Sequence, residues 1–237
     1  MILSALLLGY LLPMDRNTPQ LRILILDCNR FELATIADSL RLQGLDIIGE
    51  ARDGATATEL ARALNPDAIV INYQGCNEPL IETAHSLRVS LPSLGVVLLT
   101  DSPDLRLYGI SESDLPRGTQ LIEKSALTEL RQLRTAIESS LLPTAHTSWV
   151  ANEWDGALSS LTNIQVETLR LLAQGLSNSD IGRTRFVSEK SVEQTIARIA
   201  QHLHVTHEHG RNMRVILASE YFKWLGAPRS HALASRP

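Results

Sequence analysis

The 237-residue sequence predicts an α/β fold, a doubly wound five-stranded parallel sheet, followed by a small all-α domain of four helices. Two observations support this prediction. In residues 21–142, short apolar runs rich in Val, Ile and Leu alternate with amphipathic helical stretches, which is typical of parallel βαβ units. In residues 161–205, three short helical stretches follow one another, each preceded by a residue that can cap a helix. The 44% hydrophobic content is sufficient for ordinary cores in one or two domains.

Five strands are expected in the first part because each apolar run is short and is bounded by helical or turn residues. They cover residues 22–27, 46–50, 68–73, 95–100 and 119–123. Helices are expected at residues 30–43, 55–64, 78–90 and 127–141. Residues 102–118 contain two prolines and two glycines, so we expect only a short or broken helix between the fourth and fifth strands.

Polar residues stand at the ends of several of these strands. Asp27 and Cys28 lie at the end of the first strand, and Asn72 and Thr100 lie near the ends of the third and fourth. Ligands of doubly wound sheets bind beyond the carboxyl ends of the strands, at the switch point between the first and third. The four residues are therefore expected to line one crevice.

The helical stretches of the second part carry recognisable start signals. Thr162 and Gln165 form a capping box for a helix at residues 163–174. Ser177 begins a second, short helix, and Ser188 begins a third. The third helix places four apolar residues on one buried stripe, namely Val192, Ile196, Ile199 and Leu203.

The other faces of the third helix carry side chains that can reach base edges and phosphates from a major groove. The candidate DNA-contacting residues are Ser188, Lys190, Ser191, Glu193, Gln194, Ala197, Arg198 and Gln201. The alternative is a helical bundle without a specific partner, whose charged outer face is simply solvated.

Charge is distributed unevenly along the chain. Residues 151–237 contain 10 basic and 8 acidic side chains, whereas residues 1–150 contain 12 and 18. A mildly basic second part fits contact with phosphates. The small excess predicts a modest, salt-sensitive affinity for DNA that depends on dimerisation.

Residues 161–205 resemble the LuxR-type helix-turn-helix. The resemblance rests on residues that match in register, namely Leu161-Thr162, Gly175-Leu176-Ser177-Asn178, Ile181 and Ser188-Glu189-Lys190-Ser191-Val192. It implies a head that binds double-stranded DNA. At position 193 the family commonly has a basic or amide residue, but this chain has Glu193, which repels phosphate and can accept a hydrogen bond from cytosine.

A fourth helix is expected at residues 211–225. The LuxR-type resemblance implies that it packs against the first helix of the head and supplies the contact of a homodimer. The candidate dimerisation residues are Met213, Ile216, Leu217, Glu220, Tyr221 and Trp224.

With this head, the whole chain resembles response regulators of the NarL/FixJ type, and its first domain is similar to their receiver domain. Those receivers carry two adjacent acids after the first strand, a phosphate-accepting aspartate at the end of the third, a Thr or Ser after the fourth and a Lys after the fifth. The matching residues here are Asp27, Cys28, Asn72, Thr100 and Lys124. Two of the three acids are missing.

These replacements predict a receiver that is not phosphorylated. The amide of Asn72 is too weak a nucleophile to replace a carboxylate. Mg²⁺ prefers hard oxygen ligands, so Cys28 and Asn72 predict no tight magnesium site. Lys124 is then expected to pair with Asp27, and Thr100 to form local hydrogen bonds.

The domain boundaries follow from these patterns. Residues 1–20 are expected to lie outside the fold, and residues 227–237 to form a disordered tail. The receiver-like domain covers residues 21–142, a linker residues 143–158 and the DNA-binding domain residues 159–226. The apolar run at residues 1–12 is too short for a membrane span, which needs about 20 apolar residues.

Cysteine and histidine patterns predict neither a secreted protein nor a metal centre. The chain has two cysteines, Cys28 and Cys76, which fits the cytoplasm. They are either small buried apolar residues or a redox pair, because the loops after the first and third strands are neighbours. A metal site is not expected from the histidines, which have no accompanying cysteine: His146, His202, His204, His207 and His209.

The leading hypothesis is a cytoplasmic, nucleoid-associated transcription regulator, a homodimer that binds specific DNA sequences and is controlled independently of aspartyl phosphorylation. No catalytic residues and no cofactor are expected, because we find no paired carboxylates, no nucleophile with a base and no phosphate-binding glycine loop. The alternative is a protein-interaction module that acts on another regulator or on RNA polymerase. No membrane partner is expected.

Overall fold

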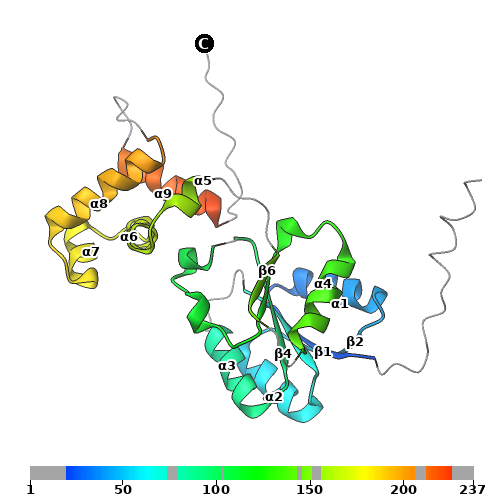
Figure 1. Cartoon of the computed structure of the whole chain (residues 1–237). Coiled ribbons are helices and arrows are strands. Elements are labelled where there is room, and N and C mark those ends of the chain that lie inside the picture. Colours follow the sequence, from blue (N-terminus) through cyan, green and yellow to red (C-terminus); the bar gives the residue numbers. More distant parts are fainter. Residues whose placement is uncertain are drawn as a thin grey trace, which may run out of the picture.

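A computed structural model describes residues 20–73, 80–102, 104–142, 146–150, 156–205 and 212–225. Figure 1 shows two lobes, a sheet covered by helices on both faces and a separate group of helices. We call them the sheet lobe and the helical lobe. None of the helices in the described ranges has the length and apolar character that crossing a bilayer demands.

The sheet contains all five predicted strands and one more. The strands are β1 (Arg22–Leu26), β2 (Asp46–Ala51), β3 (Ala68–Asn72), β4 (Gly95–Thr100), β5 (Gln120–Glu123) and β6 (Ser148–Val150). Their order is β2-β1-β3-β4-β5-β6, and every neighbouring pair is parallel. The order places the switch point between β1 and β3, as expected for a doubly wound sheet.

The sixth strand corrects part of the linker prediction. Residues 148–150 pair in register with β5, with Trp149 opposite Leu121. The side chain of Gln120 supports this pairing, since its Nε2 donates to the carbonyl oxygen of His146 at 3.0 Å. Backbone groups on the open edge of β5 are satisfied in this way, so part of the connecting segment belongs to the sheet.

The helices of the sheet lobe form two layers (Figure 1). On one face lie α1 (Arg30–Leu42) and α4 (Leu130–Ser140), and on the other lie α2 (Gly54–Leu64) and α3 (Leu80–Ser90). β1 shows how strand alternation fills both layers. Ile23 and Ile25 join the core under α1 and α4, whereas Leu24 and Leu26 join the core under α2 and α3. All four predicted helices are present, and residues 78 and 79 lie outside the described ranges.

The region after β4 is broken, as predicted. In place of one helix it forms two 3₁₀ turns, η2 (Leu105–Tyr108) and η3 (Glu112–Asp114). Gly109 ends η2 with φ at 75°, a left-handed conformation that glycine adopts without strain. A further 3₁₀ turn, η4 (Lys124–Ala126), follows β5.

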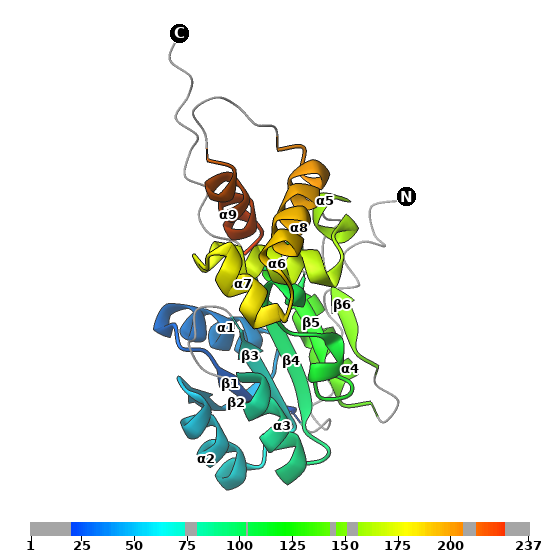
Figure 2. The same ribbon diagram turned by 90° about the vertical axis from the view of Figure 1, so that its left-hand side faces the viewer.

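The helical lobe contains the four predicted helices and a short one before them. They are α5 (Gly156–Ser160), α6 (Asn163–Ala173), α7 (Asn178–Arg185), α8 (Glu189–His202) and α9 (Met213–Trp224). Thr162, Ser177 and Ser188 cap α6, α7 and α8 as expected. Figure 2 shows these helices gathered beside the sheet lobe.

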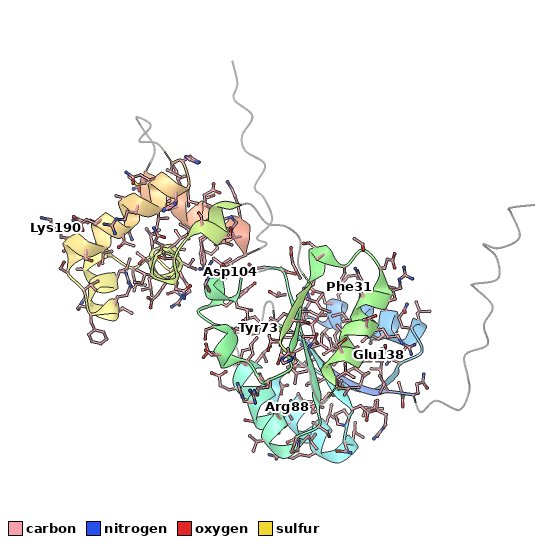
Figure 3. The ribbon with its side chains drawn as sticks, viewed as in Figure 1. Phe31, Tyr73, Arg88, Asp104, Glu138 and Lys190 are labelled. Atoms are coloured by element: carbon pink, nitrogen blue, oxygen red, sulfur yellow. The ribbon has the colours of Figure 1, made fainter. Side chains whose placement is uncertain are left out.

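The two lobes meet at η2. Leu105 is buried in the core of the sheet lobe, and Leu107, two residues later, is buried in the core of the helical lobe. Asp104 caps η2 and lies where the lobes come together (Figure 3). The 3₁₀ geometry allows this division, because residues two apart on such a turn point in different directions.

Candidate functional sites

α8 presents the predicted DNA-contacting face to solvent. Its inner side is buried through Val192, Ile196, Ile199 and Ala200. Most of the candidate residues on the outer side are exposed, namely Ser188, Lys190, Glu193, Gln194, Ala197, Arg198 and Gln201. Ser191 is half-buried, and its backbone N–H donates to the Ser188 hydroxyl at 3.2 Å. Lys190 stands at the end of the helical lobe remote from the sheet (Figure 3).

The turn between α7 and α8 holds these two helices close together. A Cβ on Gly182 would lie 2.8 Å from the carbonyl oxygen of Val187, so only glycine allows this approach of α7 to the turn. Phe186 ends α7 in the left-handed region, with φ at 55°. The turn therefore fixes the direction in which α8 leaves α7.

Two arginines fix α7 against its neighbours. The Nη1 of Arg185 donates to the Thr168 hydroxyl of α6 at 2.7 Å, and its side chain is almost buried. Arg214 of α9 donates to the carbonyl oxygen of Leu176 and to Oδ1 of Asn178 at the start of α7. Both arginines use charge-assisted hydrogen bonds, which are stronger than neutral ones.

The candidate dimerisation residues of α9 divide into two groups. Leu217, Tyr221 and Trp224 are buried in the core of the helical lobe of the same chain. They are therefore not available to a second copy while this core is intact. The remaining candidates, Met213, Ile216 and Glu220, are half-buried, and the neighbouring apolar side chains Val215 and Phe222 are exposed.

At the carboxyl ends of the strands, Asp27 and Asn72 meet as predicted. Both side chains are buried. The Nδ2 of Asn72 donates to Oδ2 of Asp27 at 2.8 Å and to Oε2 of Glu32 at 2.7 Å. The backbone N–H of Asn29 donates to the other Asp27 oxygen at 2.8 Å. Asp27 thus receives hydrogen bonds on both oxygens from the chain itself.

Lys124 does not form the predicted hydrogen bond with Asp27. Its Nζ lies 2.7 Å from Oε2 of Glu32 and 3.0 Å from Oδ1 of Asp101. The prediction was wrong because it left out two acids that reach the crevice. Asp101 directly follows Thr100 at the end of β4, so its place at the crevice could have been predicted from the sequence. Glu32 lies in the first turn of α1, and nothing local indicates that it points back toward the sheet.

The hydrogen bonds and the burial of this crevice shift the pKa values of three groups. Burial raises the pKa of Asp27, and the hydrogen bonds from Asn72 and Asn29 only partly offset this effect. The hydrogen bond from Lys124 lowers the pKa of Glu32. Burial alone would lower the pKa of Lys124, but its hydrogen bonds to Glu32 and Asp101 outweigh burial and raise it.

Two further predictions on the crevice can be compared with the structure. Thr100 forms local hydrogen bonds as expected, since its hydroxyl donates to the carbonyl oxygen of Ser102 at 2.9 Å. It also lies 3.5 Å from the hydroxyl of Tyr108, whose pKa burial raises to about 12. Cys28 is disulfide-bonded, so the prediction of a small buried apolar residue is wrong for it. Cys76 lies outside the described residues.

The histidine residues do not assemble a site in the described part of the chain. His146, His202 and His204 are exposed, and His207 and His209 lie outside the described residues. Within the described ranges, no three His, Cys, Asp or Glu side chains are grouped so that they could hold a metal ion.

Comparisons with known proteins agree with this architecture. Residues 159–210 match the family model described as bacterial regulatory proteins of the luxR family. The transcriptional regulatory protein LnrK of Bacillus subtilis (strain 168) is 27% identical over 201 residues, which cover 78% of this chain and 91% of LnrK. The DNA-binding transcriptional activator EvgA of Escherichia coli (strain K12) is 22% identical over 187 residues, 76% of this chain and 90% of EvgA.

Among solved structures, the complex of the two-component response regulator RcsB with DNA has a similar fold. Its TM-score is 0.52 at 18% sequence identity, and the alignment covers 87% of this chain and 99% of that one. Residues 159–210 therefore match a LuxR-type helix-turn-helix domain, and they follow a domain with a receiver-like fold. The transcriptional regulators LnrK and EvgA are among the relatives of the chain.

Proposed function

We propose that the protein is a sequence-specific DNA-binding transcription regulator of the response-regulator type, a cytoplasmic homodimer whose receiver-like domain works without aspartyl phosphorylation. The observation that carries the DNA-binding part is the exposed polar face of α8 on a head that matches the luxR family model. Two similar proteins support it, since EvgA is a DNA-binding transcriptional activator and RcsB forms a complex with DNA.

The residue types on α8 suit base recognition. Lys190, Gln194 and Arg198 are spaced four residues apart and so form one stripe along the helix. Arginine can form two hydrogen bonds with guanine, and glutamine can do the same with adenine. Lysine at the start of the helix suits either guanine or a phosphate. A helix in the major groove would present this stripe to several consecutive base pairs.

A homodimer compensates for the weak charge of one head. The two-residue excess of basic over acidic side chains in residues 151–237 gives little attraction to phosphates. Two heads related by a two-fold axis double the contacts and read two half-sites. The outer face of α9, with exposed Val215 and Phe222, is the surface we assign to this contact.

Phosphorylation independence rests on the buried Asn72. An amide in this position offers no anionic oxygen to attack a phosphoryl donor. The donor set also does not fit Mg²⁺. Asp27 is held by Asn72 and Asn29, Cys28 is in a disulfide, and Glu32 and Asp101 are both paired with Lys124. A magnesium ion would need oxygen ligands that are already used.

The test is a selection of DNA sequences by the intact protein at low salt, followed by binding measurements on the selected site. The variant Lys190→Ala/Arg198→Ala should lose most of the affinity, whereas Arg62→Ala, an exposed arginine on α2, should not. Intact-protein mass spectrometry after treatment with acetyl phosphate should show no added phosphoryl group. A protein that binds no DNA at low salt would instead favour the interaction module that acts on another regulator or on RNA polymerase.

A further inference from the structure

A cavity of about 250 Å³ lies between the two lobes. Arg106, Gly109 and Ile110 line it from the segment that contains η2, and Asn163, Glu167 and Arg170 line it from α6. Its volume is slightly below the usual range of small-molecule sites, which starts at about 300 Å³. The cavity can therefore hold only a small organic molecule.

One cation in this cavity, Arg170, has no hydrogen-bond or ion-pair partner among the residues that the structure describes. No hydrogen bond or ion pair joins the guanidinium of Arg170 to any described residue, and its Nε is buried without an acceptor. Buried donors are normally satisfied, so each exception requires an explanation. The guanidinium lies against Gly109, where an added Cβ would be 3.2 Å from Cζ of Arg170. The absence of a side chain at position 109 leaves room for Arg170 beside the cavity.

The other charged groups of the cavity lining have partners among the described residues, either an opposite charge or a hydrogen-bond donor or acceptor. The guanidinium of Arg106 binds Asp104 at 2.6 Å and also donates to the carbonyl oxygen of Leu161 at 2.8 Å. Glu167 pairs with Arg185 at 3.1 Å. Asp114 accepts from the backbone N–H of Ser111 at 2.7 Å. Among the charged groups that line the cavity, Arg170 is thus the one for which the described residues supply no hydrogen bond or ion pair.

We propose that this cavity binds a small organic molecule with one carboxylate, held by Arg170. The planar guanidinium matches a carboxylate with two parallel hydrogen bonds. A phosphate dianion fits less well, because Glu167 and Asp114 also line the cavity and would repel a second negative charge. Ile110 and Ile164 supply apolar contacts for the rest of the molecule.

The position of the cavity gives such a ligand a regulatory role, and this part rests on the proposed function. The ligand would touch the segment after β4 and helix α6 at the same time, and thus both lobes. Its binding would stabilise the arrangement in which the two lobes are in contact. If the protein binds DNA with a different affinity when the lobes separate, the ligand would change the DNA affinity.

Benzoate is a suitable probe, and benzamide is its uncharged counterpart. Calorimetric or NMR titration of the full chain should show benzoate binding to the wild-type protein and to the control Arg62→Gln. Arg170→Gln should weaken it by at least about tenfold, as expected for loss of a charge-assisted pair. Arg170→Lys, which keeps the charge without the planar fork, should bind with intermediate affinity. Benzamide and inorganic phosphate should bind more weakly than benzoate.

Equal benzoate affinity in the wild type and Arg170→Gln would overturn the site, as would tighter binding of phosphate or no benzoate binding at all. Circular dichroism checks that Arg170→Gln is folded. DNA binding measured with and without benzoate then tests the regulatory part. If benzoate binding depends on Arg170 but the protein does not bind DNA, the proposed function is refuted and the carboxylate site is supported.

Discussion

The hydroxyl of Tyr221 on α9 donates a hydrogen bond of 2.6 Å to the carbonyl oxygen of Leu107 on η2. The side chain of Leu107 is fully buried in the core of the helical lobe. Through this residue, the segment after β4 supplies both a backbone acceptor and an apolar side chain to the helical lobe. The two lobes are thus joined by part of a common core as well as by the chain that connects them.

Leu107→Ala should destabilise the helical lobe. Removing a fully buried leucine side chain costs about 2–5 kcal/mol, because the cavity it leaves is only partly refilled. Urea unfolding of the full chain should show this loss. Leu42→Ala is the matched control, since Leu42 is 81% exposed on α1 and its removal should cost little. Equal stability of the two variants would mean that Leu107 does not pack in solution as described.

Asn72→Asp should be destabilised at neutral pH. A carboxylate oxygen would replace the amide nitrogen that now lies 2.8 Å from Asp27 and 2.7 Å from Glu32. Like charges at this distance, together with burial, should cost at least about 1–3 kcal/mol. Unfolding measurements at pH 7 and at acidic pH should show that the loss shrinks when the new carboxyl is protonated.

Addition of Mg²⁺ should raise the thermal stability of Asn72→Asp more than that of the wild type, because the variant offers one more oxygen anion beside Asp27. Asn212→Asp is the control, since Asn212 caps α9 in the helical lobe from an exposed position and aspartate is an equally good cap. A wild-type protein that responds to Mg²⁺ as strongly as Asn72→Asp would contradict our account of the crevice.

Glu32→Gln should lower stability at neutral pH and have little effect in acid. The folded protein lowers the pKa of Glu32 below its usual 4.5. Its stabilising contribution is therefore complete above about pH 4.5 and is lost as the pH falls through the folded-state pKa. Glu32 is 39% exposed, so solvent screening limits the effect to about 1 kcal/mol or less. The control is Glu59→Gln on α2, and parallel pH profiles for the wild type and Glu32→Gln would contradict the prediction.

Glu193→Gln should strengthen DNA binding. Glu193 is exposed on the face of α8 assigned to DNA, and its carboxylate repels phosphates. Several-fold tighter binding is expected on random sequences, and the gain should be smaller on a selected site in which Glu193 accepts from a cytosine. Fluorescence anisotropy measures the affinity for random sequences and for the selected site, with Glu59→Gln as the control. Weaker binding to every sequence would show that Glu193 makes an essential contact.

Phe186→Gly should leave stability unchanged or raise it by up to about 1 kcal/mol, because glycine adopts the left-handed conformation without strain. The phenyl ring is 95% exposed, so its removal sacrifices little packing. Phe31→Gly is the matched control. Phe31 is 79% exposed but lies in the first turn of α1, where glycine should cost about 0.5–1 kcal/mol. Thermal unfolding that ranks the two variants in the opposite order would reject this explanation.

The features predicted correctly from the sequence depend on neighbouring residues. Thr162 and Gln165 form their capping box within one turn of α6, so the start of this helix follows from four consecutive residues. The apolar stripe of α8 likewise follows from helical spacing alone. The crevice could be anticipated because parallel strands end at the same edge of a sheet.

The missed features depend on contacts between distant residues. Glu32 and Lys124 form a hydrogen bond although they are 92 residues apart in the sequence. Nothing in the first turn of α1 indicates this contact. In the sequence, Leu107 is one of several apolar residues in an irregular segment. Its packing in the core of the helical lobe could not be predicted, because it depends on how the two lobes meet. The three residues of β6 are too few for a periodic pattern, so their pairing depends on the free edge of β5.

The position of β6 also limits how far the helical lobe can move from the sheet lobe. From Val150, which ends β6, to Gly156, which begins α5, the chain makes six steps of at most about 3.6 Å, a reach of roughly 20 Å. If the helical lobe lost its contacts with η2, it would remain within this distance of the edge of the sheet that β6 forms. Two such heads on neighbouring turns of a duplex would keep both sheet lobes beside the DNA, so the span covered by the bound pair should be compact.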